Sequence, residues 1–273
     1  MSAPRIRRIV VALDASEPSV AAAETAAEIA AALAVGLAGL FVEDDALLRL
    51  AGHPWAAQID ALSAERRTLD RDRLELDLRA QAERARRRLE AAARRRGATW
   101  NFAVRRGGVD EEILGGLEPG DLVAMGRVGW GGGRALGGTA RALLARGPGG
   151  VLLLPRSPAP IGAIAALCDG GAAALAALEV AAQLAASLAQ PLRLLIPLEL
   201  ADPAAVERVA GEVLAGIPIA VEIRRVAHDG LPDAISLPSR GSVLLVLPAG
   251  FAADEERAVR LVEALETPIL VLR

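Results

Sequence analysis

The sequence predicts an α/β protein made of two tandem domains, each a mainly parallel, open sheet of five strands flanked by helices. Two observations carry this prediction. Short runs of Val, Ile and Leu alternate with Ala-rich stretches, which is typical of successive βαβ units. The alternation restarts after a Pro/Ser linker at 157–160, and both repeats end alike, in VLLLPR and in ILVLR. We therefore expect one domain at 1–156 and a second at 161–273.

The composition excludes several classes of protein. Hydrophobic residues make up 53% of the chain, which excludes a disordered chain, and Cys168 is the only cysteine, which excludes a disulfide scaffold. No charge-free stretch reaches the ~18 residues of a membrane-spanning helix, and the first apolar run, which ends before Asp14, is shorter than the ~7–15 residues of a signal-peptide core. We therefore expect a cytoplasmic protein with no membrane partner. The net charge of −3 indicates no nucleic acid partner.

The first repeat opens with RRIVVALD at 7–14, a β-branched apolar run that predicts a buried parallel strand. Ser16 suits an N-cap and Pro18 suits a first helical turn, so the Ala-rich stretch from 20 to 37 predicts a helix. The later elements continue the alternation. They are strands at 37–44, 99–107, 121–126 and 151–156, with helices at 110–117 and 139–146.

A long helical insertion at 45–97 separates the second and third strands. Its first piece is broken by Gly52 and Pro54, and its second piece predicts a helix from about 65 to 96 that ends at Gly97. Acidic residues precede Arg by four positions on this helix, which is the favourable order for ion pairs. These pairs are Glu75 with Arg79, Glu83 with Arg87, and Glu90 with Arg94.

An apolar stripe follows the same helix at three- and four-residue spacing. It consists of Leu74, Leu78, Ala82, Ala85, Leu89 and Ala92. The many Arg residues would suit nucleic acid or an acidic partner, but the interleaved acids and the absence of aromatic side chains favour a solvated amphipathic helix. A third interpretation is an oligomer contact through Leu74, Leu78 and Leu89.

The second repeat follows the order of the first. Strands with their turns are expected at 161–170, 191–200, 218–230, 241–250 and 267–273. Helices are expected between them, at 171–190, 203–217, 231–238 and 254–266.

Few residues of this chain could perform catalysis. His53 and His228 have no partners at metal-ligand spacing, and the G-x-S-x-G, H-E-x-x-H and G-x-G-x-x-G motifs are absent. All 31 basic residues are Arg, so the chain has no lysine for a P-loop or for a Schiff base. We therefore expect no catalytic residues and no metal ligands.

The remaining candidate is a binding site formed by Asp14 and the glycine-rich turn 126–139. Ligands of open parallel sheets bind beyond the carboxyl ends of the strands, where both Asp14 and Gly126 are expected. Glycines let backbone N–H groups approach phosphate oxygens, and Gly138-Thr139 would open a helix with its donors and dipole. Arg127 could add positive charge. The alternative is that these glycines only form a loop.

These residues resemble the universal stress protein family, whose fold is Rossmann-like. VVALDASEPS at 10–19 is similar to that family's first strand and turn, and the stretch 122–156 is similar to its fourth strand, nucleotide loop, helix and last strand. The ATP-binding branch of the family has the loop G-x2-G-x9-G-[S/T]. This sequence has Gly126-x2-Gly129 and then Gly138-Thr139, with eight intervening residues in place of nine.

The resemblance implies ATP or another adenine nucleotide as ligand, with or without Mg2+. It implies contacts to adenine and ribose from Asp14 and the backbone of Val42, a ribose contact at Gly126, and phosphate contacts at Gly129, Gly138 and Thr139. The second repeat departs from the motif: Asp169 follows its first strand one position later than Asp14 does in the first repeat, and no glycine loop is present. We expect a degenerate second domain without nucleotide.

The resemblance also implies pairing of VLLLPR with ILVLR, which would give an intramolecular pseudo-dimer, with a homodimer as the other arrangement. The leading hypothesis is a nucleotide-responsive regulator with at most slow ATP hydrolysis. A second is a nucleotide-independent, stress-related interaction module acting through dimerisation. A third is an enzyme in which Asp14 and Asp121 meet in one pocket.

Overall fold

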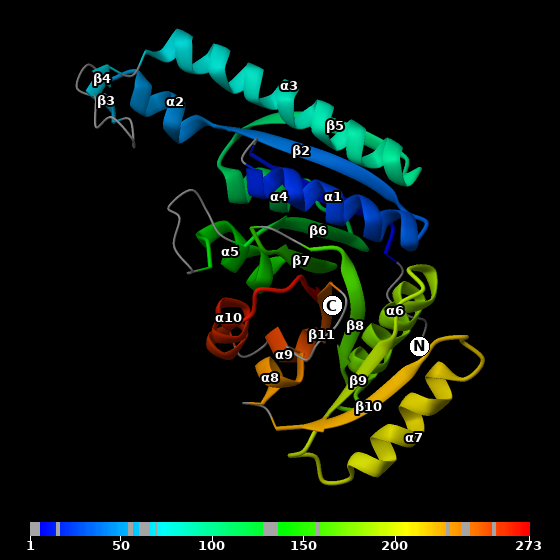
Figure 1. Cartoon of the computed structure of the whole chain (residues 1–273). Helices are drawn as coiled ribbons and strands as arrows, with labels where there is room; N and C mark the ends of the chain where they lie inside the picture. Colours follow the sequence, from blue (N-terminus) through cyan, green and yellow to red (C-terminus); the bar gives the residue numbers. More distant parts are fainter. Residues whose placement is uncertain are drawn as a thin grey trace.

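The computed structural model describes residues 6–14, 17–53, 57–59, 66–68, 70–127, 136–156, 159–227, 230–235, 241–252 and 255–273. Ten strands form one continuous sheet (Figure 1) in the order β10-β9-β8-β11-β12-β7-β6-β1-β2-β5. We call residues 6–156 the N-terminal half and residues 159–273 the C-terminal half.

The N-terminal half supplies one side of the sheet. Its strands are β1 (Arg8–Leu13), β2 (Gly36–Asp44), β5 (Trp100–Gly107), β6 (Asp121–Gly126) and β7 (Gly150–Leu154). Its helices are α1 (Glu17–Ala32), α2 (Asp45–Ala51), α3 (Arg71–Arg96), α4 (Val109–Gly115) and α5 (Gly138–Arg146). A separate antiparallel pair, β3 (Ala57–Ile59) and β4 (Arg66–Thr68), lies between α2 and α3.

The C-terminal half repeats the arrangement. Its strands are β8 (Ile161–Leu167), β9 (Leu192–Pro197), β10 (Val221–Val226), β11 (Ser242–Pro248) and β12 (Ile269–Leu272). Its helices are α6 (Ala172–Ser187), α7 (Pro203–Leu214), α8 (Leu231–Ile235), α9 (Ala249–Ala252) and α10 (Glu255–Ala264). The predicted α/β class is confirmed, and the two predicted sets of five parallel strands join into one ten-stranded, mainly parallel sheet.

The two halves meet along one antiparallel strand pair. Within each half, all neighbouring strands of the ten-stranded sheet are parallel, whereas β7 and β12 pair antiparallel, with Gly150 opposite Leu272 and Leu153 opposite Ile269. The predicted pairing of VLLLPR with ILVLR is therefore present. Each closing strand covers the open edge of the other, which leaves β5 and β10 as the edges of the joined sheet.

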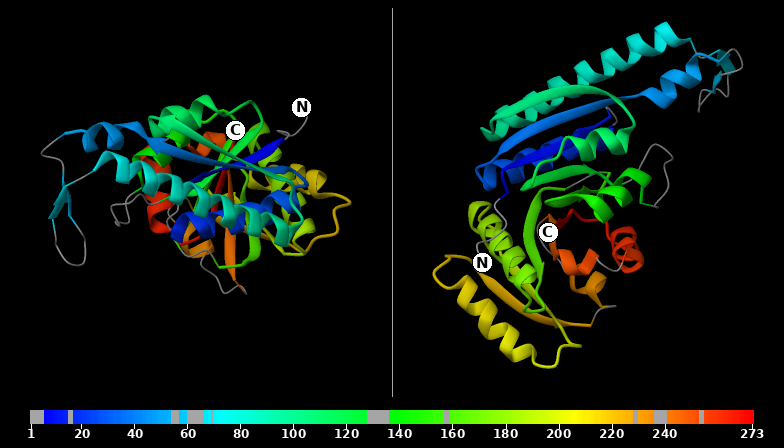
Figure 2. Two further views of the ribbon diagram at one scale, coloured as in Figure 1. Left: turned by 90° about the horizontal axis from the view of Figure 1, so that it is seen from above. Right: turned by 180° about the vertical axis from the view of Figure 1, so that it is seen from behind.

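Two apolar cores cover the two faces of the sheet and run through both halves. α1, α3, α6 and α7 pack on one face, and α4, α5, α8, α9 and α10 pack on the other (Figure 2). Every residue of β7 and β12 is buried, as expected for strands covered on both faces. Among the described residues, no helix is long and apolar enough to cross a membrane.

The long helix α3 starts later than the sequence predicted. It begins at Arg71, because the Asp70 carboxylate accepts the backbone N–H of Arg73 at 2.9 Å and so caps the first turn. Residues 66–68 form β4 in place of helix. The end at Gly97 is confirmed, with a left-handed φ of 68°. The predicted helix from 20 to 37 also ends earlier, at Ala32, because Ala34 adopts a φ of 55°.

The face of α3 agrees with the solvated-helix interpretation. The three predicted i,i+4 pairs form, with Arg87 2.9 Å from Glu83 and Arg94 2.7 Å from Glu90 among them. The proposed oligomer contact is wrong, because Leu78 and Leu89 are buried in the core and Leu74 packs against it.

Candidate functional site

The carboxyl ends of β1, β2 and β6 lie side by side at one edge of the sheet. Leu13 pairs with Phe41, and Val11 pairs with Ala124. Since these strands are parallel, one further step along β1 brings Asp14 beside Val42, one position beyond the level of Gly126. The structure therefore brings together three of the residues that the sequence placed in a site.

The turn after β1 is held by a side chain. The backbone N–H of Asp14 donates to Ser19 Oγ at 3.1 Å, and Ser19 is 5% exposed. This contact ties the end of β1 to the first turn of α1. The predicted N-cap Ser16 lies outside the described residues.

The segment after β6 is closed by backbone hydrogen bonds. The N–H of Arg127 donates to the carbonyl of Leu154 at 3.0 Å, and the N–H of Gly137 donates to the carbonyl of Arg127 at 3.0 Å. A Cβ built on Gly126 would meet no atom of the described residues within 4 Å, so these residues leave the space over this strand end open. Gly129 lies outside the described residues.

The start of α5 presents donors to the same edge. Gly137 is its N-cap and makes no side-chain cap, so the N–H groups of the first turn have no acceptor within the helix. Gly138 is exposed and Thr139 is half-buried, and a Cβ on Gly138 would also meet open space. The N-terminal end of a helix with free N–H groups favours an anion.

Arg127 does not point toward this edge. Its side chain donates to the carbonyl of Val262 at 2.8 Å, to the carbonyl of Leu265, and to Glu266 Oε2 at 2.7 Å, all in and just after α10. Burial lowers the pKa of its guanidinium, although an arginine still stays charged. The expectation that the Arg127 side chain adds charge at a phosphate is therefore wrong, because α10 already occupies it.

The suggested acidic pair of Asp14 and Asp121 is also wrong. Asp121 is the first residue of β6 and Asp14 follows the last residue of β1, so the two side chains lie at opposite edges of the sheet. The carboxylate of Asp121 is bound by Arg8 at 2.6 Å. Among the described residues, no three His, Cys, Asp or Glu side chains gather as a metal site.

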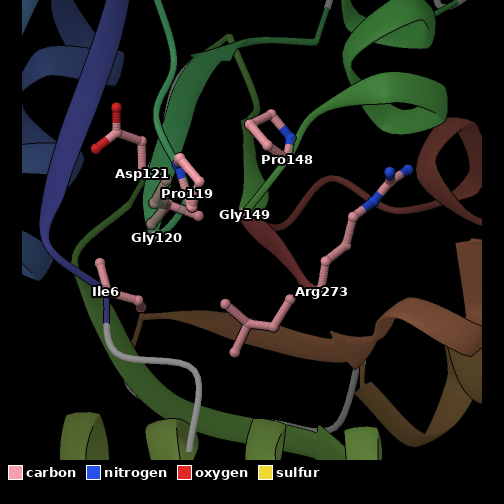
Figure 3. A pocket seen from close by; sticks show the side chains of 9 residues that line it. Ile6, Pro119, Gly120, Asp121, Pro148, Gly149 and Arg273 are labelled. Carbon is pink, nitrogen blue, oxygen red and sulfur yellow. The ribbon is translucent and has the colours of Figure 1, made fainter.

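A pocket of about 230 Å3 lies at that opposite edge, between the start of β6, the turn before β7 and the end of β12. Figure 3 shows Asp121 and Arg273 on opposite sides of it. Its polar groups already have partners: Asp121 binds Arg8, and the carbonyl of Gly149 accepts the N–H of Arg273 at 3.0 Å. The carboxylate of Asp121, which lines this pocket, is therefore already paired.

The C-terminal half has no counterpart of the segment 127–137. β11 ends at Pro248 and α9 begins at the next residue, Ala249. Asp169 lies after β8, where its Oδ1 accepts the N–H of Gly171 at 2.8 Å. This carboxylate closes its own turn.

Sequence reasoning missed two acidic residues beside the candidate site, Glu263 in α10 and Glu266 just after it. Glu263 Oε1 accepts the backbone N–H of Leu136 at 3.0 Å, and Glu266 pairs with Arg127. Both contacts join residues more than a hundred positions apart, so no local pattern could have indicated them.

The doubled order of parallel strands flanked by helices defines a Rossmann-type α/β protein. The model of the universal stress protein family matches residues 5–155. The chain therefore belongs to the universal stress protein family. No curated protein matches the sequence.

Solved structures share the fold across both halves. A universal stress protein of Archaeoglobus fulgidus is similar with a TM-score of 0.70 and 16% identity, covering 98% of this chain and 97% of that chain. A functionally unknown protein of Pseudomonas aeruginosa PAO1 gives 0.61 and 17%, covering 98% and 92%. The cytoplasmic domain of a prokaryotic cation chloride cotransporter gives 0.52 and 14%, covering 98% and 95%. At these identities the likeness shows the fold alone.

Proposed function

We propose that this chain is a cytoplasmic, nucleotide-responsive regulator whose N-terminal half binds an adenine nucleotide. One observation carries the proposal: Asp14, Val42, Gly126 and the start of α5 share one edge of the parallel sheet. That edge is where open α/β sheets bind their ligands. Family membership supports the same location.

The roles of the residues follow from their chemistry. The Asp14 carboxylate and the Val42 backbone suit the hydroxyls of ribose and the ring edge of adenine, and Gly126 leaves room for the sugar. The N–H groups of Gly138 and Thr139, which have no acceptor among the described residues, suit phosphate oxygens together with the Thr139 hydroxyl. Since the chain has no Lys, backbone donors and the helix dipole supply the attraction to phosphate.

Calorimetric titration with ATP, ADP and AMP, with and without Mg2+, tests the proposal, together with mass spectrometry of ligand that co-purifies with the native protein. Gly138→Val places a side chain in the open space before α5. We expect it to weaken binding about tenfold or more, because each lost hydrogen bond to a charged group costs about 1.5–3 kcal/mol.

Gly250→Val is the matched control. Gly250 also lies near the start of a helix that follows a sheet strand, and a Cβ there also meets nothing within 4 Å. The control should bind nucleotide like the wild type. Absence of binding at millimolar nucleotide, or equal weakening by both substitutions, would contradict the proposal.

A nucleotide-independent interaction module is the second candidate function. Leu76 on α3 is 63% exposed, and Leu47 and Leu50 on α2 are 38% and 41% exposed. Large apolar side chains that remain exposed on neighbouring helices are typical of a contact surface.

Light scattering of the protein, with and without ATP, tests this candidate. It predicts a dimer that does not depend on nucleotide and that dissociates when Leu76 is changed to Gln. A monomer with bound nucleotide would rule it out.

A further inference from the structure

The segment that follows β6 is attached to the opposite half of the molecule at its first residue. Arg127 is 5% exposed, and its guanidinium contacts the carbonyls of Val262 and Leu265 and the carboxylate of Glu266. The carbonyl of Val262 lies in the last turn of α10 and that of Leu265 follows directly after the helix, so both lie at its negative end. A residue of the N-terminal half thus caps a helix of the C-terminal half.

The same segment is attached to α10 again at its other end. Leu136, which is 6% exposed, donates its backbone N–H to Glu263 Oε1 at 3.0 Å. The next residue, Gly137, donates to the carbonyl of Arg127 and is the N-cap of α5. One helix of the C-terminal half therefore holds both ends of the segment, immediately before the free donors of α5. Figure 1 and Figure 2 show α10 beside α5.

The two attachments are chemically reciprocal. The N-terminal half supplies a cation to carbonyls of α10, and α10 supplies a carboxylate to an amide of the N-terminal half. Hydrogen bonds with one charged partner are stronger than neutral ones and set position as well as energy. The buried setting of Arg127 and Leu136 reduces competition from water for both contacts.

We infer that α10 is a built-in anchor for the phosphate end of the nucleotide site, with Glu263 and Arg127 as positioning residues. The inference rests on the proposed function for its ligand, an adenine nucleotide. The C-terminal half then has a role in binding although it lacks a glycine segment of its own. Because coupling between two sites is reciprocal, nucleotide in the N-terminal half also strengthens the docking of α10.

Glu263→Ala tests the anchor without any nucleotide. Hydrogen exchange at the amides of Leu136 and Gly137 should become faster by about tenfold, because the N–H of Leu136 loses a charged acceptor. Glu263→Gln keeps a neutral acceptor and should restore most of the protection. Glu256→Ala is the control: Glu256 lies on the same helix, is 83% exposed and pairs only locally, with Arg260 at 2.9 Å.

Titration with ATP then tests the coupling. In the folded protein, Glu263→Ala should weaken ATP binding about threefold to tenfold, whereas Glu263→Gln and Glu256→Ala should bind ATP like the wild type. ATP should also slow exchange at amides 262–266 of the wild type. A merely structural role would lower the melting temperature and leave the affinity of the folded protein unchanged.

The outcomes separate the inference from the proposed function. If hydrogen exchange at the Leu136 amide is unchanged in Glu263→Ala, the inference that α10 anchors the segment is wrong. Faster exchange with unchanged ATP affinity overturns the coupling. If the wild type binds no ATP, the proposed function fails and the coupling fails with it, while exchange at Leu136 still decides whether α10 holds the segment.

Discussion

Asp121 holds the amino end of the N-terminal sheet, and replacing it by Asn should destabilise the fold without opening a cavity. Its side chain is 1% exposed and accepts hydrogen bonds from Arg8 Nε at 2.9 Å and Arg8 Nη2 at 2.6 Å. The backbone N–H of Glu118 donates to the same carboxylate at 2.8 Å. One carboxylate thus joins β6, the start of β1 and the turn after α4.

The magnitude follows from these contacts. The single oxygen of Asn can take the place of Oδ2, which accepts from both Arg8 Nη2 and the Glu118 N–H, but the amide NH2 then faces Arg8 Nε, so one hydrogen bond is lost and two donors meet. A hydrogen bond to a charged group contributes about 1.5–3 kcal/mol, and the two bonds that remain are weaker because their acceptor is no longer charged. Arg8 is 34% exposed and regains water, which reduces the cost. We expect the free energy of unfolding to fall by about 2–3 kcal/mol.

Urea denaturation measures this change, and a double-mutant cycle with Arg8→Met isolates the pair. We expect a coupling of about 1–3 kcal/mol between the two positions. The neighbouring pair of Arg7 and Glu118, at 3.3 Å, is the control, because both of its side chains are largely exposed. Arg7→Met should change stability by less than about 0.5 kcal/mol. If Asp121→Asn lowers the free energy of unfolding by no more than Arg7→Met does, burial of the Arg8–Asp121 pair does not determine its contribution to stability.

Three further predictions concern single residues. Gly211→Ala in α7, where a Cβ meets nothing within 4 Å, should raise the unfolding free energy by about 0.5–1 kcal/mol, and an unchanged urea midpoint would contradict this. Hydrogen bonds from Arg86 and then Arg87 lower the pKa of Glu83 to about 2, so its contribution to stability should be complete above pH 4.5 and be lost as the pH falls toward 2. An NMR titration of Glu83 that returns an ordinary pKa would refute the pairing. Burial raises the pKa of the Cys168 thiol, so iodoacetamide should modify it in urea and not in the native protein; rapid native modification would show that the thiol is accessible.

Most of the fold could be predicted from local patterns. The runs IVVAL, VLLLP and ILVL became buried strands, because an apolar stretch of that length can be satisfied only between two covered faces. The apolar stripe and the terminal glycine of α3 likewise correspond to a buried face and a left-handed C-cap. The resemblance to the universal stress protein family predicted the pairing of VLLLPR with ILVLR, and the structure shows it as the antiparallel pair of β7 and β12.

The start of α3 and the orientation of Arg127 could not be predicted in this way. Good helix formers continue upstream of Asp70, but the capping carboxylate and the short strand β4 decide where the helix begins. Arg127 lies next to the glycine segment in sequence, which suggested a phosphate contact. In the folded chain the Arg127 guanidinium instead donates to the carbonyls of Val262 and Leu265, at the end of α10.

Some features of the candidate site could be predicted from the sequence, and others could not. Residue order alone placed Asp14 and Gly126 at carboxyl ends of parallel strands and Gly138 at a helix start, because these positions follow from strand direction and short connections. Only the folded chain brings α10 against Arg127 and Leu136 and separates Asp14 from Asp121. Periodicity, caps and turns act over a few residues and can be found in the sequence. Hydrogen bonds between residues more than a hundred positions apart depend on how two layers of helices pack against one joined sheet.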